Sequence, residues 1–376
     1  MSSFDREMMS RALQLAAKGR FTSSPNPTVG CVITMDDVIV SEGFTCPAGG
    51  NHGEIEALQR AGEVAGATVY VSLEPCSHHG KTGPCADALI AAAVARVVVA
   101  VEDPNPVVAG AGIKKLRDSG VEVQVGLLEG QARVVNKGFF MRHEQGRPWV
   151  TVKMAASLDG RTAMASGQSQ WITAPAARTD VQILRAESCA VITGIGTQKM
   201  DDPSLTVRMS YSVLDPTVED CNLQLRQPLR VVVDARAEMS SEARMLQQPG
   251  STLVAVADEM VQRERAKGLQ CAGAEVLFVP AVDGRLNLQC LLERLAERGC
   301  NRVMVEAGAG LAGAFVAEGL FDEVVCYWAP KLFGSAARPM FELPIETIDA
   351  HLALSLMDVR RIGEDLRLTL HPDKDY

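Results

Sequence analysis

Aromatic residues and long apolar runs are scarce in this sequence. Phe, Trp and Tyr together make up 5% of its 376 residues. No stretch approaches the ~20 apolar residues that span a bilayer, so we expect no membrane partner. Residues 1–20 mix acids with bases and lack the apolar core of a secretory signal. The cytoplasm is therefore the expected location.

Basic residues are also fewer than acidic ones. Lys and Arg number 37 against 46 Asp and Glu, which gives a formal net charge of −9. Binding to a nucleic-acid backbone needs clustered positive charge, so we expect no nucleic-acid partner, although a local basic pocket for one phosphate is compatible with this balance. The composition, 47% hydrophobic and 22% charged, excludes disordered, collagenous and coiled-coil chains.

Cysteine is not concentrated as it is in small disulfide-bonded domains. The 10 cysteines are spread along the chain, and without an export signal we expect them to be mostly reduced. Cysteines that lie close together therefore suggest metal binding before disulfides.

The length exceeds that of one ordinary domain, which holds roughly 100–200 residues. Hydrophobic periodicity predicts helices at residues 8–17, 53–65, 86–95 and 113–119 and strands at 29–34, 38–40, 68–73, 96–101 and 121–125. Helices between strands predict a mostly parallel, layered α/β domain. Residues 142–148 are polar, end in Gly and Pro and predict a linker. The predicted domains are residues 1–146 and 147–376.

A second alternating series follows the predicted linker. Strands are predicted at residues 149–154, 190–193, 230–234, 252–257, 275–279, 302–306 and 323–329, with a last pair within 353–371, and helices at 176–187, 259–267, 288–298 and 311–318.

The strongest chemical pattern is His52-Gly53-Glu54, followed by Pro75-Cys76 and Pro84-Cys85. One imidazole and two thiolates with an open fourth position suit a catalytic zinc site. Zinc in such a site brings the pKa of a bound water close to neutral, and Glu54 would pass the water's proton to a leaving group. His52 and Cys85 each lie at the start of a predicted helix, where partial positive charge favours a thiolate.

Two structural interpretations compete with this one. In the first, the motif consists of buried structural cysteines and a surface histidine. In the second, it forms a closed structural zinc site with His78 or His79 as fourth ligand. The closed site leaves Glu54 without a role. The order H-x-E, then P-C and a second Cys follows the zinc deaminase pattern, but here eight residues separate Cys76 from Cys85.

Two glycine-rich segments follow predicted strands in the second half. Residues 308–313 read G-x-G-x-x-G before a helix, where backbone N–H groups can approach a phosphate. A simple tight turn is the alternative. The motif lies late in its domain, and Asp322 and Glu323 come too early for a Rossmann unit. Residues 194–197 also follow a strand, so both segments could converge on one dinucleotide.

Taken together, these patterns resemble the bifunctional deaminase/reductase family of riboflavin biosynthesis. The zinc loop LEPCSHHGKTGPC at residues 73–85, with residues 25–33 and 103–106, is similar to the family's deaminase domain, and residues 147–376 resemble its reductase domain. The resemblance covers essentially the whole chain in the family's order. It implies a cytidine-deaminase-like α/β/α layered domain, then a dihydrofolate-reductase-like α/β domain, and homo-oligomers.

The resemblance also implies the reactions and the cofactors. The first domain would use one Zn²⁺ per chain to deaminate 2,5-diamino-6-(5-phosphoribosylamino)pyrimidin-4-one by hydrolysis. The second would use NADPH to reduce the ribosyl group, which gives 5-amino-6-(5-phosphoribitylamino)uracil. The partner is then a small phosphorylated pyrimidine.

Residue roles carry over onto the matching positions. The metal ligands are His52, Cys76 and Cys85, the catalytic residue is Glu54, and substrate contacts in the first domain fall on Asn26, His78 and Lys81. NADPH contacts fall on Ala155, Trp171, Thr197, Asp201, Ala235, Gly308, Ala309, Gly310, Leu311, Ala312, Gly313 and Ala314. Substrate contacts in the second domain fall on Lys153, Ser169, Arg185, Leu205, Arg208 and Glu306.

Several of these residues have plainer alternatives. Arg185 and Arg208 suit phosphate clamps, but each could be a solvated residue. Asp201 could be a cap or turn residue, and Trp171 a core aromatic.

Two positions depart from the family pattern. Gly53 stands where the family usually has Ala, and Ala309 where it more often has Pro. A glycine costs a helix up to ~1 kcal/mol relative to alanine. Gly53 removes no ligand, so we expect activity to survive.

Two other function classes share parts of the pattern. A nucleic-acid-editing deaminase applies the same zinc chemistry to flipped-out bases, but the net charge of −9 and the large second half argue against it. A non-enzymatic module that keeps zinc for stability would have no use for Glu54.

Overall fold

The computed structural model describes residues 1–77, 83–214 and 225–373. These residues divide into two compact units, and the chain passes from one to the other between Gly146 and Arg147. Each unit has its own hydrophobic core. No helix within the described ranges is long and apolar enough to cross a membrane.

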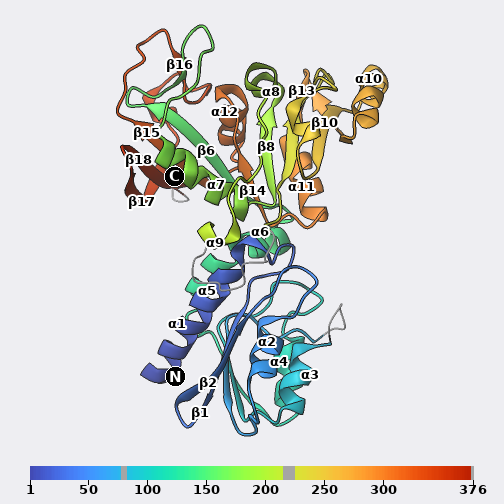
Figure 1. The fold of residues 1–376 in the computed structure, drawn as a ribbon, viewed down its shortest axis with the longest axis vertical. Coiled ribbons are helices and arrows are strands. Elements are labelled where there is room, and N and C mark those ends of the chain that lie inside the picture. Colours follow the sequence, from blue (N-terminus) through green and yellow to red (C-terminus); the bar gives the residue numbers. More distant parts are fainter. Residues whose placement is uncertain (78–82, 215–224, 374–376) are drawn as a thin grey trace. The chain divides into compact units, whose positions relative to one another are not determined.

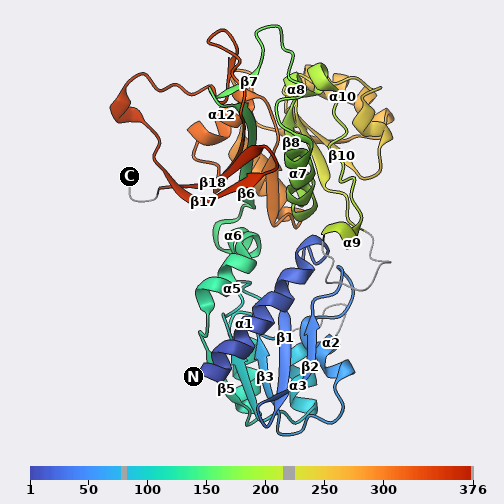
Figure 2. The ribbon, with the colours of Figure 1, turned by 60° about the vertical axis from the view of Figure 1, so that its left-hand side comes forward.

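The first unit is an α/β/α sandwich. Its helices are α1 (Ser3–Lys18), η1 (Gly19–Phe21), α2 (Gly53–Arg60), α3 (Cys85–Ala91), α4 (Ala111–Asp118), α5 (Glu129–Val135) and α6 (Lys137–Gln145), and its strands are β1 (Gly30–Met35), β2 (Val38–Phe44), β3 (Thr68–Val71), β4 (Arg96–Val99) and β5 (Glu122–Val125). The sheet order is β2-β1-β3-β4-β5, with β1 antiparallel to its neighbours and β3, β4 and β5 parallel. α1 and α5 cover one face, and α2, α3 and α4 cover the other (Figures 1 and 2). The strands β1, β3 and β4 are accordingly buried on both faces.

Four segments meet at one edge of this sheet. β3 and β4 end there, whereas β1 begins there because it runs antiparallel to β3. The chain after β2 starts from the same edge, since Phe44 pairs with Gly30. The motifs that contain Asn26, His52 and Cys76 therefore lie at one edge of the sheet, although they are far apart in the sequence.

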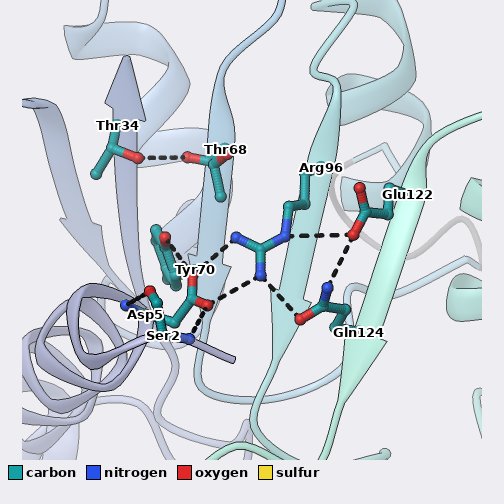
Figure 3. A network of polar contacts seen from close by, with 8 residues as sticks. All are labelled: Ser2, Asp5, Thr34, Thr68, Tyr70, Arg96, Glu122 and Gln124. Carbon is teal, nitrogen blue, oxygen red and sulfur yellow. Dashed lines mark hydrogen bonds and ion pairs between the residues drawn. The ribbon is translucent and has the colours of Figure 1, made fainter. Parts of the chain in front are cut away.

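A polar network fixes α1 at the opposite edge, where β3, β4 and β5 begin (Figure 3). Arg96 donates to both carboxylate oxygens of Asp5, at 2.7 and 3.1 Å, and Tyr70 OH donates to Asp5 Oδ1 at 2.8 Å. Arg96 also pairs with Glu122 at 3.5 Å. The Arg96 guanidinium holds the pKa of Asp5 far below its usual range, although burial opposes this shift. Ser2 and Asp5 form a reciprocal capping box at the start of α1.

The second unit is built on a larger sheet. Its helices are α7 (Pro175–Glu187), α8 (Ile195–Asp201), α9 (Tyr211–Leu214), η2 (Arg244–Gln247), α10 (Met260–Cys271), α11 (Leu288–Glu297), α12 (Ala309–Ala317) and η3 (Ile348–Ala350). Its strands are β6 (Trp149–Ser157), β7 (Arg161–Ala163), β8 (Ala190–Gly194), β9 (Leu229–Val233), β10 (Thr252–Ala257), β11 (Glu275–Val279), β12 (Ala281–Val282), β13 (Arg285–Leu286), β14 (Arg302–Val305), β15 (Glu323–Ala329), β16 (Arg338–Pro339), β17 (Leu354–Ile362) and β18 (Asp365–Pro372).

The main sheet of this unit has nine described strands in the order β11-β10-β9-β8-β14-β6-β15-β18-β17. The strands from β11 at one end of this order through β10, β9, β8, β14 and β6 to β15 are parallel to one another. The hairpin β17–β18 adds antiparallel strands next to β15. Leu253 and Ala255 of β10 belong to the core with α11 and α12, whereas Val254 and Val256 belong to the core with α7. Because side chains alternate along a strand, helices cover both faces. The mixed α/β architecture of both units agrees with the predicted fold class.

Several predicted boundaries are wrong. α1 begins at Ser3 and not at residue 8, and α10 ends at Cys271 and not at residue 267. α2 ends at Arg60 and not at residue 65, because Ala61 adopts extended backbone and Gly62 follows. α3 ends at Ala91 and not at residue 95, and Ala93 takes a positive φ of 52°. Residues 142–145 of the predicted linker belong to α6, so that only residues 146–148 separate α6 from β6.

Candidate active sites

Three side chains that can bind a metal gather at the motif-bearing edge of the first sheet. His52 Nδ1 lies 3.3 Å from Cys85 Sγ and 3.6 Å from Cys76 Sγ, and all three ligand atoms lie within 4.8 Å of one another. Zn–S bonds of about 2.3 Å and Zn–N bonds of about 2.0 Å put neighbouring tetrahedral ligands about 3.5 Å apart. Hydrogen bonds from Cys85 and His52 lower the pKa of Cys76 well below its ordinary value, against the opposing effect of burial. The donor set and its spacing fit one zinc ion with an open fourth position.

Helix starts position two of these ligands. His52 is the N-cap residue of α2, with extended backbone at φ −77° and ψ 162°, and Cys85 is the first residue of α3, after Pro84. Gly53 allows α2 to lie close to β1, since a Cβ atom there would be 2.7 Å from the Val29 carbonyl oxygen. His52 and Cys85 thus reach the same edge of the sheet because each stands at the start of a different helix, α2 or α3.

Glu54 lies at the second position of α2 and is 2% exposed. Its Oε2 atom accepts no hydrogen bond in the described part of the chain. Burial raises the pKa of Glu54 to about 7, and His52 partly opposes this rise. A buried carboxyl group with an unused oxygen beside a metal cluster is suited to move a proton. The geometry therefore fits the proton-transfer role predicted for Glu54.

The loop that carries Asn26 is held at the same edge. Thr28 N donates to Asn136 Oδ1 and Asn136 Nδ2 donates to Thr28 O, both at 2.9 Å. Val29 N donates to Thr45 Oγ1 at 2.9 Å. The sequence did not single out Asn136, because 108 residues separate it from Thr28. The other two predicted contacts of this domain, His78 and Lys81, lie outside the described residues.

In the second unit, a cavity of about 650 Å³ opens where β6, β8 and β14 end. It gathers most of the residues predicted for the reductase domain, namely Lys153, Ala155, Ser169, Trp171, Arg185, Thr197, Asp201, Leu205, Arg208, Glu306, Gly308, Ala309, Gly310 and Leu311. Gly308 N donates to Thr197 Oγ1 at 3.1 Å, so the two glycine-rich strand ends meet. Asp201 is the last residue of α8 and not a cap, and its Oδ1 accepts a hydrogen bond from Ser169 Oγ at 3.2 Å.

A buried ion network lies in the wall of this cavity. Arg185 donates to both carboxylate oxygens of Glu306 at 2.9 Å, and Lys153 Nζ lies 3.3 Å from Glu306 Oε1. Arg185 also donates to the Thr206 carbonyl oxygen at 3.2 Å. Burial raises the pKa of Glu306, but Arg185 and Lys153 outweigh burial and hold the pKa at about 2. The Arg185 guanidinium is therefore engaged by Glu306 in the wall of the cavity, and at 9% exposure Arg185 is not a solvated residue.

Arg208 differs from Arg185. It is exposed at the cavity and makes no ion pair within the described ranges. Its backbone N–H donates to Gln182 Oε1 at 3.0 Å, and Gln227 holds Val207 through two hydrogen bonds of 2.9 and 3.0 Å. Arg178, Arg244 and Arg338 also line the cavity. A chain of net charge −9 thus contains a locally basic pocket.

Trp171 lines the same cavity and is 64% exposed, which excludes a core aromatic. The Arg178 guanidinium lies 4.5 Å from the centre of the indole ring, and Lys331 Nζ donates to the carbonyl oxygens of Trp171 and Ile172 at 3.0 and 2.6 Å. Neither Arg178 nor Lys331 belongs to a glycine-rich segment or another motif, so no sequence signal pointed to them.

A second cavity, of about 910 Å³, shares Gly310 and Leu311 with the first and is also lined by Ala235, Gly313 and Ala314. Buried Asp234 lies in its wall, and the Oδ1 atom of this residue has no hydrogen-bond partner among the described residues. Ala312 lines neither cavity, because its side chain is fully buried in the core.

Both halves of the chain match known families. Residues 2–101 match the cytidine and deoxycytidylate deaminase zinc-binding region, and residues 148–368 match the RibD C-terminal domain. The chain is 48% identical to the riboflavin biosynthesis protein RibD of Escherichia coli K12 over 97% of this chain and 99% of that protein. It is 44% identical to RibD of Haemophilus influenzae over 99% of this chain and 98% of that protein.

Solved structures give the same result. Acinetobacter baumannii RibD superposes with a TM-score of 0.89 at 43% identity, and 99% of both chains are covered. The diaminohydroxyphosphoribosylaminopyrimidine deaminase/5-amino-6-(5-phosphoribosylamino)uracil reductase of Thermotoga maritima superposes with a TM-score of 0.83 at 30% identity, over 98% of this chain and 99% of that chain. This chain therefore belongs to the RibD family of bifunctional deaminase/reductases of riboflavin biosynthesis.

Proposed function

We propose that this chain catalyses two successive steps on one phosphorylated pyrimidine. The first unit deaminates 2,5-diamino-6-(5-phosphoribosylamino)pyrimidin-4-one, and the second reduces the ribosyl group to give 5-amino-6-(5-phosphoribitylamino)uracil with NADPH. The observation that carries the proposal is the cluster of His52, Cys76 and Cys85 beside a buried carboxyl group with an unused oxygen.

In the deaminase site, His52, Cys76 and Cys85 would hold one zinc ion. Zinc bound there supplies Lewis acidity that makes water a nucleophile near neutral pH. Glu54 takes a proton at Oε2 and passes it to the departing amine, which leaves as ammonia. A cation next to Glu54 lowers the pKa of this carboxyl group from the value of about 7 that burial produces in its absence. Asn26 orients the pyrimidine, and His78 and Lys81 are further proposed contacts of the substrate.

In the reductase site, the basic cavity takes the phosphorylated sugar. Arg208 is the proposed phosphate ligand, because its guanidinium makes no ion pair within the described residues and reaches the cavity. Arg185 orients Glu306, which with Lys153 faces the sugar, and Arg185 is itself a further proposed contact of the substrate. Ser169 and Leu205 complete the proposed substrate contacts.

NADPH would extend across the two adjoining cavities. When bound, it supplies a hydride to the sugar carbon that is reduced. Ala155, Trp171, Thr197 and Asp201 border the cavity that also contains the substrate residues, whereas Ala235, Gly313 and Ala314 border the larger one. Residues 308–311 lie between them at the start of α12, where backbone N–H groups suit the pyrophosphate.

The direct test uses the purified chain loaded with zinc, the diamino substrate and NADPH, and it follows ammonia release and NADPH oxidation. Both are expected. Glu54→Gln should abolish ammonia release but leave NADPH oxidation with the deaminated intermediate, and the exposed Glu63→Gln should leave both unchanged. If the zinc-loaded parent chain neither releases ammonia nor oxidises NADPH, the proposal is wrong.

We further propose a homo-oligomeric enzyme in the cytoplasm. A reducing compartment suits the site, because zinc binding requires Cys76 and Cys85 as thiolates and not as a disulfide. Both cysteines are free in the structure.

A further inference from the structure

Glu74 immediately precedes Pro75-Cys76, and this residue is 3% exposed. Four backbone N–H groups donate to it. Oε2 accepts from Asp103 at 3.1 Å and from Gly110 at 2.9 Å, and Oε1 accepts from Gly112 at 2.9 Å and from Ile113 at 3.1 Å. The carboxylate is thus fully satisfied by one segment, the loop after β4 and the start of α4.

This contact replaces a cap that α4 lacks. The N-cap residue of α4 is Gly110, at φ 80°, which has no side chain to accept the first N–H groups of the helix. Such groups need an acceptor when they are buried. Glu74 supplies it from another segment, and its negative charge is favourable at a helix N-terminus.

The backbone next to Glu74 is packed just as tightly on α4. A Cβ atom at Gly112 would lie 1.9 Å from the Pro75 carbonyl oxygen, so only glycine allows this approach. Glu74 N also donates to Val101 O at 3.0 Å. The segment that leads into Cys76 is therefore fixed by its backbone and by its side chain.

α4 also supports the other thiol. α3, which begins with Cys85, contacts α4, and Leu89 of α3 and Leu116 of α4 belong to the same hydrophobic core. Cys85 N donates to Cys76 Sγ at 3.3 Å. The segments that carry the two cysteines thus both contact α4, whereas His52 belongs to a different element, α2.

We propose that Glu74 is a positioning residue of the metal centre. By accepting the N–H groups at the start of α4, its carboxylate sets the place of Cys76 relative to Cys85 and His52. This inference rests on the proposed zinc site. A glutamine at position 74 retains one acceptor oxygen, but its NH₂ group faces two N–H donors, so about half of the contact is lost.

The test compares Glu74→Gln with Glu102→Gln in the whole chain. Glu102 is an exposed carboxylate in the same loop, and it is the matched control. Zinc affinity is measured by competition with a chelator, and the absorption spectrum of the Co²⁺-substituted protein reports the thiolate geometry. NADPH oxidation with the deaminated intermediate verifies that the second unit is intact.

We expect Glu74→Gln to lose at least about tenfold in zinc affinity, the range found for residues that orient metal ligands. Its Co²⁺ spectrum should change, and excess zinc should restore part of the ammonia release. Unchanged zinc affinity and an unchanged Co²⁺ spectrum would overturn the inference, whatever happens to stability. If Glu74→Gln does not fold, Glu74→Asp, which keeps the charge but shortens the reach, is judged by the same measurements. A parent chain that binds no zinc would instead refute the proposed function.

Discussion

Gly53 separates His52 from Glu54, and the close approach of α2 to β1 depends on it. A Cβ atom at this position would lie 2.7 Å from Val29 O and 3.2 Å from the Phe44 Cα. The substitution Gly53→Ala gains up to ~1 kcal/mol of helix propensity, but overpacking against backbone costs about 1–3 kcal/mol. We expect a net loss of stability and a lower kcat for ammonia release, because α2 must move and must carry His52 and Glu54 with it.

Thermal unfolding and ammonia release measure this effect. Gly62→Ala is the control, since Gly62 follows α2 and a Cβ atom there meets nothing within 4 Å. It should be neutral or slightly stabilising. A Gly53→Ala protein that is more stable than the parent chain and equally active would show that α2 can take an alanine without moving.

The Glu306 network leads to a prediction about pH. Glu306→Gln leaves the buried Arg185 and the half-buried Lys153 without a counter-charge, which costs about 3–5 kcal/mol. Because the pKa of Glu306 is held at about 2, below its value of about 4.3 in an unfolded chain, the stabilisation is present above about pH 4.3. It is lost as the pH falls toward 2.

Urea unfolding of the parent chain and of Glu306→Gln from pH 7 to pH 3 checks this sign. The gap between the two free energies of unfolding should shrink as the pH falls. NADPH oxidation should be lost while ammonia release continues. The exposed Glu346→Gln should match the parent chain at every pH, and a gap that widens in acid would contradict the role given to Glu306.

Among whole elements, α1 depends on one buried carboxylate at the edge of the sheet opposite the metal cluster. Asp5→Asn removes the charge that Arg96 and Tyr70 contact (Figure 3). Hydrogen bonds to charged groups contribute about 1.5–3 kcal/mol, so we expect a loss of that size in the first unit. Because the pKa of Asp5 is depressed in the folded chain, this contribution is lost as the pH falls below about 3.9.

Glu122→Gln provides the matched control, since Glu122 contacts the same Arg96 but its side chain is 61% exposed. It should change stability by less than about 0.5 kcal/mol. Thermal unfolding monitored through loss of ammonia release distinguishes the two variants. Equal effects would mean that α1 does not depend on the buried contact.

Strongly periodic elements were predictable from the sequence, but α5 and α6 were not. Only Ala132 of α5 is buried, and α6 buries Gly138, Phe139 and Phe140, so neither shows an apolar face of helical period. The end of α2 was overestimated because Val64 continues the apolar pattern although it packs into the core beyond the helix.

The candidate sites divide in the same way. Cys76, Cys85 and His52 stand in short motifs, so their spacing predicted the cluster that the structure contains. Asn136 lies 108 residues from Thr28, and the N–H donors of Glu74 lie 29 to 39 residues from it. Only the folded chain brings each of these pairs into contact. The ion pair that engages Arg185 was likewise invisible, because Glu306 lies 121 residues away.

For the molecule as a whole, the two units place the two chemistries on separate cores. The metal cluster lies within the first unit, and both cavities of the reductase site lie within the second. Removing zinc with a chelator should therefore abolish ammonia release and leave NADPH oxidation with the deaminated intermediate. A ligand that binds only the folded state stabilises it by about 4.1 kcal/mol at 1,000 times its Kd. Removal of zinc should therefore lower the unfolding temperature of the first unit and leave that of the second unit unchanged.

Calorimetry of the zinc-loaded and the stripped chain, together with both activity assays, measures this outcome. Zinc added back should restore ammonia release and the higher unfolding temperature, because Cys76 and Cys85 stay free and close to His52. Loss of both activities on stripping would show that the second unit depends on the metal. No His or Cys is among the described residues that line the cavity with Glu306, Lys153 and Arg208, so we expect NADPH oxidation to be independent of zinc.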